Sequence, residues 1–170
     1  YRFGYDGVAS RTGTCRTLPK PDASPDSLRV GVLACQNYCN GYYPALGHVA
    51  DEELDFLVHV GDFIYESGDG EFRGLGSRDY QDRGIELPSG ADRVQDIDDY
   101  RYLYRTYRSD RFLQRALESH TLIAAWDDHE IANDVYWDPE DDAPKADHPR
   151  GEAPEFMTRP TADAIHAWWE

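Results

Sequence analysis

The segment around Asp62 constrains the fold of this chain more than any other. Leu57 to Val60 form an apolar run with β-branched residues, and Gly61, Asp62 and, three residues later, Tyr65 follow it. A short apolar run bounded by glycine is typical of a buried strand. Ligands of open α/β sheets bind just beyond the carboxyl ends of such strands. The sequence therefore predicts that Asp62 and Tyr65 project from a strand-to-helix turn into one site, where both offer oxygen to a hard cation.

Two other apolar segments also end in polar residues. Residues 28–35 run into Cys35-Gln36-Asn37, and residues 121–126 run into Asp127-Asp128-His129-Glu130. Helical spacing over residues 42–54 separates the first strand from the second, at residues 55–60, and predicts a β-α-β unit with parallel strands. Because parallel strands end at the same edge of a sheet, the three polar clusters are expected to converge.

Apolar spacing predicts the remaining elements of an α/β fold. A helix that starts near residues 96–98 is expected to pack an aromatic face on the sheet, through Tyr100, Leu103, Tyr104 and Tyr107. A shorter helix is expected around residues 112–117. Thr161 is expected to cap a final helix, with Pro160 just outside it. The apolar side of that helix would consist of Ala164, Ile165, Trp168 and Trp169. Residues 66–90 and 138–160 are expected to be loops.

The domain organisation follows from composition. Residues 1–26 are rich in Gly, Pro, Ser and Asp and are expected to be the end of a preceding β-sandwich-like domain and a linker. Residues 27–170 are expected to form the α/β domain. The chain starts at Tyr1 rather than at methionine and stops inside the expected final helix, so we expect a fragment of a longer protein.

The charge of the chain excludes some partners. Its 17 basic and 33 acidic residues give a formal net charge of −16, which repels nucleic acids and anionic membranes. A salt-rich environment would screen this self-repulsion, although an ordinary acidic protein is an equally good explanation. No apolar stretch is long enough to span a membrane, and no signal segment opens the chain. The three cysteines allow one disulfide and a free thiol, while their spacing does not favour structural zinc.

Each polar cluster has an ordinary structural explanation when it is considered alone. Asp62 would serve as a helix cap, Asp127-Asp128 as a solvated acidic turn, His129 as a hydrogen-bonded structural histidine and Cys35 as a core residue. Together at one sheet edge, these explanations leave adjacent carboxylates with few basic residues nearby. Bound cations would relieve that repulsion.

The residues also suggest a reaction. Two metal ions that share Asp62 would lie close enough for one to activate water while both neutralise a phosphoryl group. His129 would hydrogen-bond a phosphoryl oxygen or protonate the departing alkoxide. Hydrolysis of phosphate esters depends on such charge stabilisation more than on a protein nucleophile.

Three ordered motifs resemble the PhoD family of alkaline phosphatases and phosphodiesterases, a branch of the calcineurin-like metallophosphoesterases. The motifs are Ala34-Cys35-Gln36-Asn37-Tyr38, then His59-Val60-Gly61-Asp62-Phe63-Ile64-Tyr65-Glu66, then Trp126-Asp127-Asp128-His129-Glu130 with Asn133 after it. Their order and separation fit the family over nearly the whole chain.

The resemblance implies an iron ion (Fe³⁺) with calcium (Ca²⁺) nearby, in a site that hydrolyses phosphate mono- and diesters. Carried over by position, Cys35 and Tyr65 become iron ligands and Asp62 the bridging ligand. Asp128 takes the place of the asparagine in the Gly-Asn-His-Glu motif of the wider superfamily, so it becomes a metal ligand beside the catalytic His129. Asn133 is a further metal ligand by position. The resemblance also implies a secreted or cell-surface protein.

The family's remaining metal ligands lie in later motifs that these residues do not contain. The chain is therefore expected to be the N-terminal half of a metallophosphoesterase αββα sandwich with a parallel or mixed sheet. Taken alone, it is expected to bind metal poorly and to turn over little substrate, whereas an extended form is expected to be active. In the loop over residues 66–90, Arg73, Arg78 and Arg83 would either shape an anion-binding lid or pair with neighbouring carboxylates.

Two other functions stay open from the sequence. One is an inactive or assembly-dependent metal-binding partial domain that associates through an exposed sheet edge and Trp168-Trp169. The other is a carbohydrate hydrolase that uses Asp62 and Asp128 as acid and base without a metal. That second function leaves Cys35 and Tyr65 unexplained.

Overall fold

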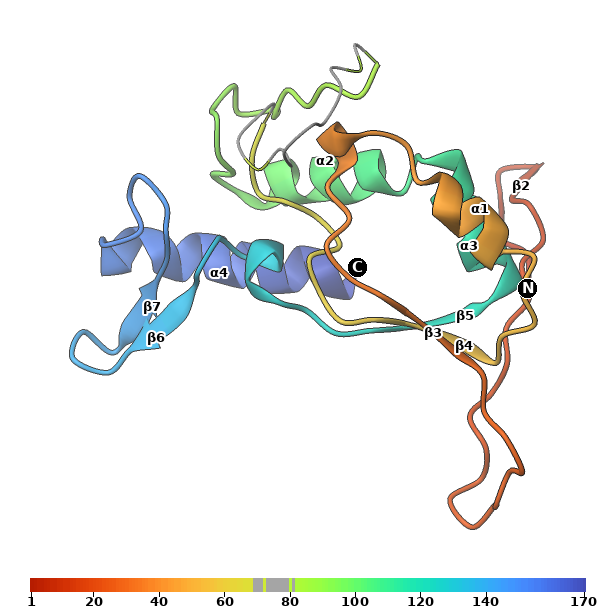
Figure 1. The fold of residues 1–170 in the computed structure, drawn as a ribbon. Coiled ribbons are helices and arrows are strands. Elements are labelled where there is room, and N and C mark those ends of the chain that lie inside the picture. Colours follow the sequence, from red (N-terminus) through yellow and green to blue (C-terminus); the bar gives the residue numbers. More distant parts are fainter. Residues whose placement is uncertain (69–71, 73–79, 81) are drawn as a thin grey trace. The chain divides into compact units, whose positions relative to one another are not determined.

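The computed structural model describes residues 1–68, 72, 80 and 82–170, and the chain divides into two compact units (Figure 1). Unit 1 comprises residues 1–33, 42–60 and 108–125, and unit 2 comprises residues 34–41, 61–107 and 126–170. The chain passes from unit 1 into unit 2 just after each strand of a parallel sheet. All three predicted polar clusters therefore belong to unit 2.

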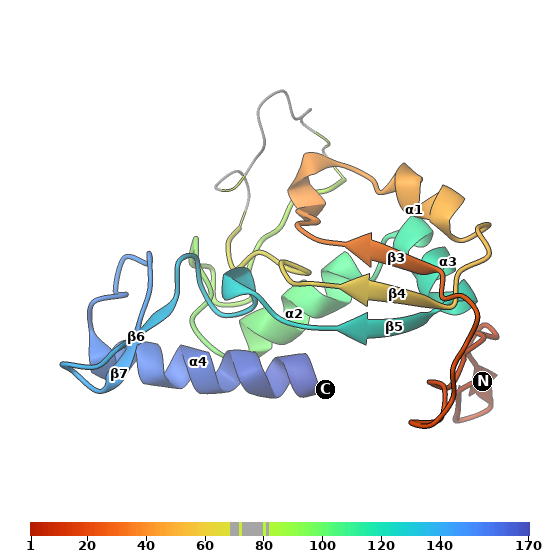
Figure 2. The same ribbon diagram turned by 60° about the horizontal axis from the view of Figure 1, so that its bottom comes forward.

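Unit 1 contains the predicted parallel sheet, in the order β3 (Val30–Leu33), β4 (Phe56–His59) and β5 (Thr121–Ala124). Figure 2 shows the three arrows side by side and pointing the same way. All three predicted strands are confirmed, each somewhat shorter than expected. The central strand β4 is the most buried, with Leu57 fully buried.

Two helices of unit 1 lie on the same side of this sheet (Figure 2). They are α1 (Pro44–Val49), which starts with proline at a position where no N–H bond is lost, and α3 (Arg111–Ser119). Asp110 caps α3, because its carboxylate accepts the backbone N–H groups of Phe112 and Leu113. The α1 helix covers only part of the predicted range 42–54.

The other face of the sheet carries exposed aliphatic side chains. Val32, Val58 and Ile123 pair in register, so their side chains share one face, and Val32 and Ile123 are 67% and 40% exposed. Parallel sheets are usually covered on both faces. This face is thus a candidate surface for association.

The N-terminal residues of unit 1 form a small hairpin. Its strands are β1 (Gly4–Tyr5) and β2 (Val8–Ala9), which pair antiparallel. Asp6 and Gly7 between them both have positive φ, as a two-residue type I′ turn requires. The assignment of residues 1–26 to a preceding domain stays a prediction.

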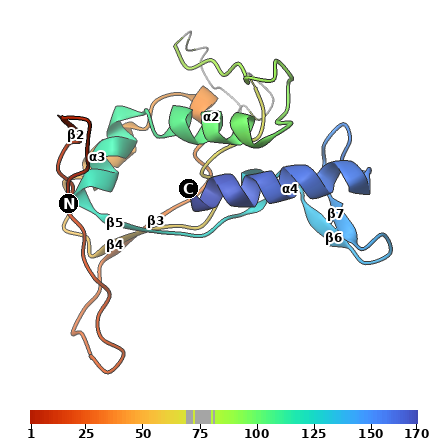
Figure 3. The ribbon, with the colours of Figure 1, turned by 180° about the vertical axis from the view of Figure 1, so that it is seen from behind.

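Unit 2 is built around two helices in contact, α2 (Ile97–Tyr107) and α4 (Pro154–Trp169). The predicted α2 helix is confirmed, and Tyr100, Leu103 and Tyr107 of its stripe are buried. Beside α4 lies an antiparallel hairpin of β6 (Tyr136–Asp138) and β7 (Ala143–Lys145), visible in Figure 3. Two short 3₁₀ helices complete the unit, η1 (Tyr38–Asn40) and η2 (Asp128–Glu130).

The prediction for residues 138–160 was wrong in two respects. This stretch is not one loop, because it contains most of the β6–β7 hairpin and the first two turns of α4. Pro160 lies inside α4, so Thr161 does not cap the helix. Buried Phe156 and Met157 pack with Ala132 and Ala146, and this packing offsets the backbone hydrogen bond that Pro160 cannot make. The predicted apolar side is also only partly right, since Trp169 is 74% exposed.

Two predictions concern charged loops and membranes. Arg83 is buried and donates to the carbonyl oxygens of Tyr38 and Gly41, so it holds the backbone and does not line a solvent-facing anion site. Arg73 and Arg78 lie outside the described residues.

Among the residues that the structure describes, no helix is long and apolar enough to cross a membrane.

Buried His59 predicts a pH-dependent stability. Burial lowers its pKa from 6.5 to about 4, so it stays neutral in the fold while the unfolded chain takes up a proton as the pH falls through 6.5. Stability should therefore fall between pH 6.5 and 4, by at most about 3 kcal/mol from this group. Urea unfolding across this pH range measures the effect. His59→Gln should flatten the dependence relative to exposed His48→Gln, and equal slopes in the two variants would contradict the assignment.

Candidate metal centre

The turn after β4 holds Asp62 in an unusual backbone conformation. Gly61, Asp62 and Cys35 all have positive φ, at 118°, 57° and 54°. Such angles are costly for residues other than glycine and are found mostly where function or packing demands them. The Cys35 N–H donates to the Gly61 carbonyl at 3.2 Å, and the Gln36 N–H donates to that of Asp62 at 3.1 Å. These bonds place the Cys35 and Asp62 segments side by side.

The predicted strand-to-helix turn at Asp62 was wrong. The described residues after Asp62 form no helix before α2 begins at Ile97. Residues 61–65 are instead a turn whose backbone is held by side chains, including the Tyr107 hydroxyl, which accepts the Tyr65 N–H at 3.2 Å. Asp62 is therefore not a helix cap, which removes its main structural explanation.

The Asp62 carboxylate lies between two predicted iron ligands, the thiol of Cys35 and the phenol of Tyr65. Its Oδ2 atom is 3.3 Å from Cys35 Sγ and 3.3 Å from the Tyr65 hydroxyl. Its Oδ1 atom is buried and has no hydrogen-bond partner among the residues that the structure describes. A buried carboxylate oxygen without a partner is costly unless a cation compensates it. The donor set thus fits a bound metal.

The ionisation of these groups supports the same conclusion. Burial, followed by the charge of Asp62, raises the pKa of the Tyr65 phenol well above its usual value of 10. Partial burial and the hydrogen bond to Asp62 raise the pKa of the Cys35 thiol. Without a cation, burial and the Asp62 carboxylate together keep the thiol and the phenol protonated. Both would need a positive charge nearby to act as anionic ligands.

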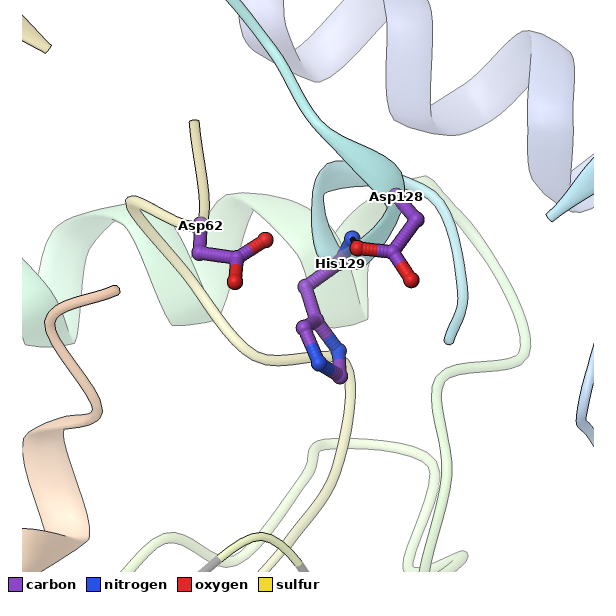
Figure 4. A group of neighbouring side chains, drawn as sticks. All are labelled: Asp62, Asp128 and His129. Atoms are coloured by element: carbon purple, nitrogen blue, oxygen red, sulfur yellow. Dashed lines mark hydrogen bonds between the residues drawn. The ribbon is translucent and has the colours of Figure 1, made fainter. Parts of the chain in front are cut away.

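Asp128 and His129, on η2, complete the cluster. One ligand atom from each of Asp62, Asp128 and His129 lies within 4.8 Å of the others. In Figure 4 the two carboxylates point toward one another and the imidazole of His129 lies beside them. Backbone N–H groups fix the Asp128 carboxylate, from His129 at 3.0 Å and from Asp134 at 2.6 Å. The predicted convergence of these acids is thus present within unit 2.

A buried carboxylate holds the His129 ring. Glu66, which is fully buried, lies 2.7 Å from Nδ1 of His129 through Oε2. The other oxygen of Glu66 accepts from Arg93 at 3.1 Å and from the Asn133 N–H at 2.8 Å. Burial works to lower the pKa of His129, but the hydrogen bond to Glu66 and the nearby acids outweigh it and raise that pKa. Glu66 therefore sets both the orientation and the charge of the imidazole.

Aromatic rings further restrict His129. The Tyr65 ring is 4.1 Å from the imidazole by ring centroids, and the Phe72 ring is 4.6 Å away and nearly perpendicular to it. Contacts at these distances favour one ring orientation. Tyr65 thus touches both Asp62 and His129.

Asn133 differs from the other predicted ligands. Its side-chain amide nitrogen donates to the carboxylates of Asp147, at 3.0 Å, and Asp134, at 3.3 Å. The structure therefore places Asn133 in a hydrogen-bonded acidic neighbourhood next to Glu66. Its role as a metal ligand stays a prediction.

Sequence reasoning assigned no role to Glu66, Arg93 or Glu130. Glu66 and Glu130 each close one of the quoted motifs, and a carboxylate next to apolar residues indicates a buried, hydrogen-bonded acid. Arg93 lies 27 residues from Glu66 in the chain and has no local signal. Only the fold brings these two together.

The fold and the site define an α/β protein with a candidate metal centre built from chain segments that follow parallel strands in the sequence. The family model of the PhoD-like phosphatases matches residues 30–170. The chain therefore belongs to the PhoD-like phosphatase family, and the predicted family and α/β fold class are confirmed.

Two relatives extend this result. Alkaline phosphatase D of Bacillus subtilis (strain 168) is 35% identical over 133 residues, which are 78% of this chain and 22% of that protein. The solved structure titled "Structure of PhoD" superimposes with a TM-score of 0.80 at 30% identity, over 99% of this chain and 29% of that chain. The chain thus spans between a fifth and a third of the length of these relatives.

Proposed function

We propose that this chain supplies part of the active site of a metal-dependent hydrolase of phosphate mono- and diesters. The observation that carries the proposal is the clustering of Asp62, Asp128 and His129, together with an Asp62 Oδ1 atom that has no hydrogen-bond partner within the described part of the chain. Phosphate ester hydrolysis does not need a protein nucleophile such as serine, because stabilisation of the charge on the phosphoryl group provides most of the catalysis. Membership of a phosphatase family agrees with this reaction.

The donor types support the proposed metals. Cys35 and Tyr65 would hold Fe³⁺ together with Asp62, because thiolate and phenolate suit iron better than they suit calcium. Asp62 and Asp128 would share Ca²⁺, which prefers carboxylate oxygens. When bound, these cations would neutralise the phosphoryl group and make water more acidic. Asn133 would add its amide oxygen, while its amide nitrogen donates to Asp134 and Asp147.

The protein's own residues then have distinct tasks. Glu66 engages Nδ1 of His129 and so directs Nε2 toward the substrate. From there, His129 would hydrogen-bond a phosphoryl oxygen or deliver a proton to the departing alkoxide. Tyr65 and Phe72 limit rotation of the ring. Asp128, held by two backbone N–H groups, keeps its carboxylate in one orientation.

Turnover of p-nitrophenyl phosphate and bis(p-nitrophenyl) phosphate tests the proposal. We compare the 170-residue chain with a fusion in which the remaining length of the Bacillus subtilis relative follows it. The fusion should hydrolyse at least one ester and lose activity with a chelator, and the chain alone should turn over little. In the fusion, His129→Asn should lower kcat by about 10²- to 10⁴-fold. Ester turnover that survives chelation would contradict metal dependence, whereas glycoside hydrolysis that survives chelation would favour a metal-free carbohydrate hydrolase.

A second candidate function is a metal-binding partial domain that works only by assembly. The exposed apolar face of β3 and β5, with Val32 and Ile123, favours it. Sedimentation with metal analysis separates the two functions. A self-associated chain that binds metal without turnover, alone or in the fusion, supports assembly, whereas a monomer with bound metal counts against it.

Two wider proposals rest on family membership and charge. A secreted or cell-surface location follows from the family resemblance, and cell fractionation tests it. The net charge of −16 supports a salt-rich environment, where screening reduces repulsion. Urea unfolding in low and in molar KCl tests the salt-rich environment, because the free energy of unfolding of a halophilic chain should rise with salt.

A further inference from the structure

The carboxylate of Glu130 is buried and binds only backbone groups in the contacts that the structure describes. Glu130 is 1% exposed. Its Oε2 atom accepts the N–H of Asp62 at 3.0 Å and that of Asp127 at 2.6 Å, and its Oε1 atom accepts the N–H of Phe63 at 2.5 Å. Three backbone donors thus converge on one side chain. Hydrogen bonds from backbone N–H groups to a carboxylate are among the stronger ones in proteins.

These bonds explain how Asp62 keeps its left-handed backbone. Successive N–H groups beside a residue with positive φ form a concave nest that binds an anion. Here the nest is formed by Asp62, with φ of 57°, and Phe63, and the anion is the Glu130 carboxylate. The cost of the unusual φ is offset as long as this anion occupies the nest.

The same carboxylate joins the two segments that carry the acids of the cluster. Asp62 lies on the turn after β4, and Asp127 directly precedes Asp128 on η2. Because one oxygen of Glu130 accepts from both Asp62 and Asp127, it sets the distance between these segments. Gly61 allows this approach, since a Cβ atom there would lie 2.4 Å from Cβ of Asp127.

We propose that Glu130 is a positioning residue of the metal centre: its carboxylate fills the backbone nest at Asp62 and Phe63 and fixes Asp62 against Asp128. The metal role of this centre rests on the proposed function. Glu130 is not in the group of candidate ligands, and its carboxylate accepts three backbone N–H groups. Its removal should disturb the geometry of Asp62 while leaving every candidate ligand in the chain.

The test uses the full 170-residue chain without metal and two variants. Glu130→Gln keeps the size of the side chain but turns one acceptor into an NH₂ group that faces a backbone donor. Glu130→Asp keeps the carboxylate on a shorter stem. Leu113→Val, in the core of unit 1, controls for a general loss of stability.

Two measurements are decisive. In metal-free protein, Glu130→Gln should shift the amide protons of Asp62, Phe63 and Asp127 upfield, and the HN–Hα coupling of Asp62 should leave the value for positive φ. In calorimetric titration with Ca²⁺, Glu130→Gln should weaken binding by about 10- to 100-fold, Glu130→Asp should weaken it less, and Leu113→Val should leave it unchanged.

The outcomes separate this inference from the proposed function. Wild-type amide shifts and coupling in Glu130→Gln would overturn the inference, as would a Leu113→Val variant that loses as much Ca²⁺ affinity as Glu130→Gln. If the wild-type chain takes up no Ca²⁺, the amide measurements on metal-free protein alone decide whether Glu130 positions Asp62. A fusion that hydrolyses no ester would defeat the proposed function, yet these amide and Ca²⁺ measurements would still support or overturn the role of Glu130.

Discussion

Replacing Asp62 by asparagine is expected to reduce metal affinity by about 100-fold or more, since even the loss of a hydrogen-bond partner behind a metal ligand costs about 10- to 100-fold. The substitution keeps the shape of the side chain but removes the charge at the centre of the cluster. It leaves Cys35 and Tyr65 facing a neutral amide, and a cation would lose the negative charge of a carboxylate whose Oδ1 has no hydrogen-bond partner among the described residues. Turnover by the fusion should fall to background. Metal content by mass spectrometry and calorimetric titration measure the loss.

Asp26→Asn is the matched control for this change. Asp26 is exposed and belongs to unit 1, so the variant loses the same charge outside the unit that holds the candidate ligands. It should bind metal and sediment as the wild type does. If Asp62→Asn keeps the metal content of Asp26→Asn, Asp62 is not a ligand, and the centre as a whole would have to be abandoned.

Gly61→Ala is expected to have the largest effect on stability. A side chain at φ of 118° is strained, and its Cβ would also lie 2.4 Å from the Asp127 Cβ and 2.5 Å from the Asp127 backbone nitrogen. Backbone atoms cannot move aside as a flexible side chain would. Strain and overlap together should lower the free energy of unfolding by about 2–5 kcal/mol. Urea unfolding followed by circular dichroism measures the change.

Gly90→Ala separates the effect of backbone strain from the effect of steric overlap. Gly90 also has positive φ, at 72°, but a Cβ there would meet nothing within 4 Å. It should cost only the strain of a left-handed alanine, about 1 kcal/mol. The difference between the variants reports the contact of Gly61 with Asp127. Equal losses would mean that the close approach of these segments is not rigid, and the positioning role of Glu130 would weaken with it.

Local patterns predicted most of the elements around the site. The apolar runs that became β3, β4 and β5 each carry β-branched residues and each end in polar ones, so strands and their common direction followed from periodicity and connectivity. The stripe of α2 followed from spacing for the same reason. The motifs at Cys35, Asp62 and Asp128 also predicted the family, which the family match confirms.

Elements held by distant contacts were not predictable in this way. The proline at position 160 was expected to lie just before the start of the final helix. Instead α4 begins at Pro154 and continues through Pro160, because Phe156 and Met157 pack against Ala132 and Ala146. The β6–β7 hairpin was missed because its strands are only three residues long, and the second contains a proline. Propensity acts over a few neighbours, and these contacts override it.

The sequence by itself determined which residues are candidates for the chemistry: Cys35, Asp62, Tyr65, Asp128 and His129 all follow apolar strands, and the common direction of the strands predicts that they converge. The tertiary structure decided how they are held. Glu66 orients His129 across 63 residues of chain, and Glu130 holds Asp62 across 68. Both carboxylates are buried among N–H donors. In such an interior of low polarity a hydrogen bond to a carboxylate is strong, and a buried carboxylate without hydrogen bonds is costly. Which donors surround a given carboxylate depends on packing between distant segments, and sequence periodicity carries no record of it.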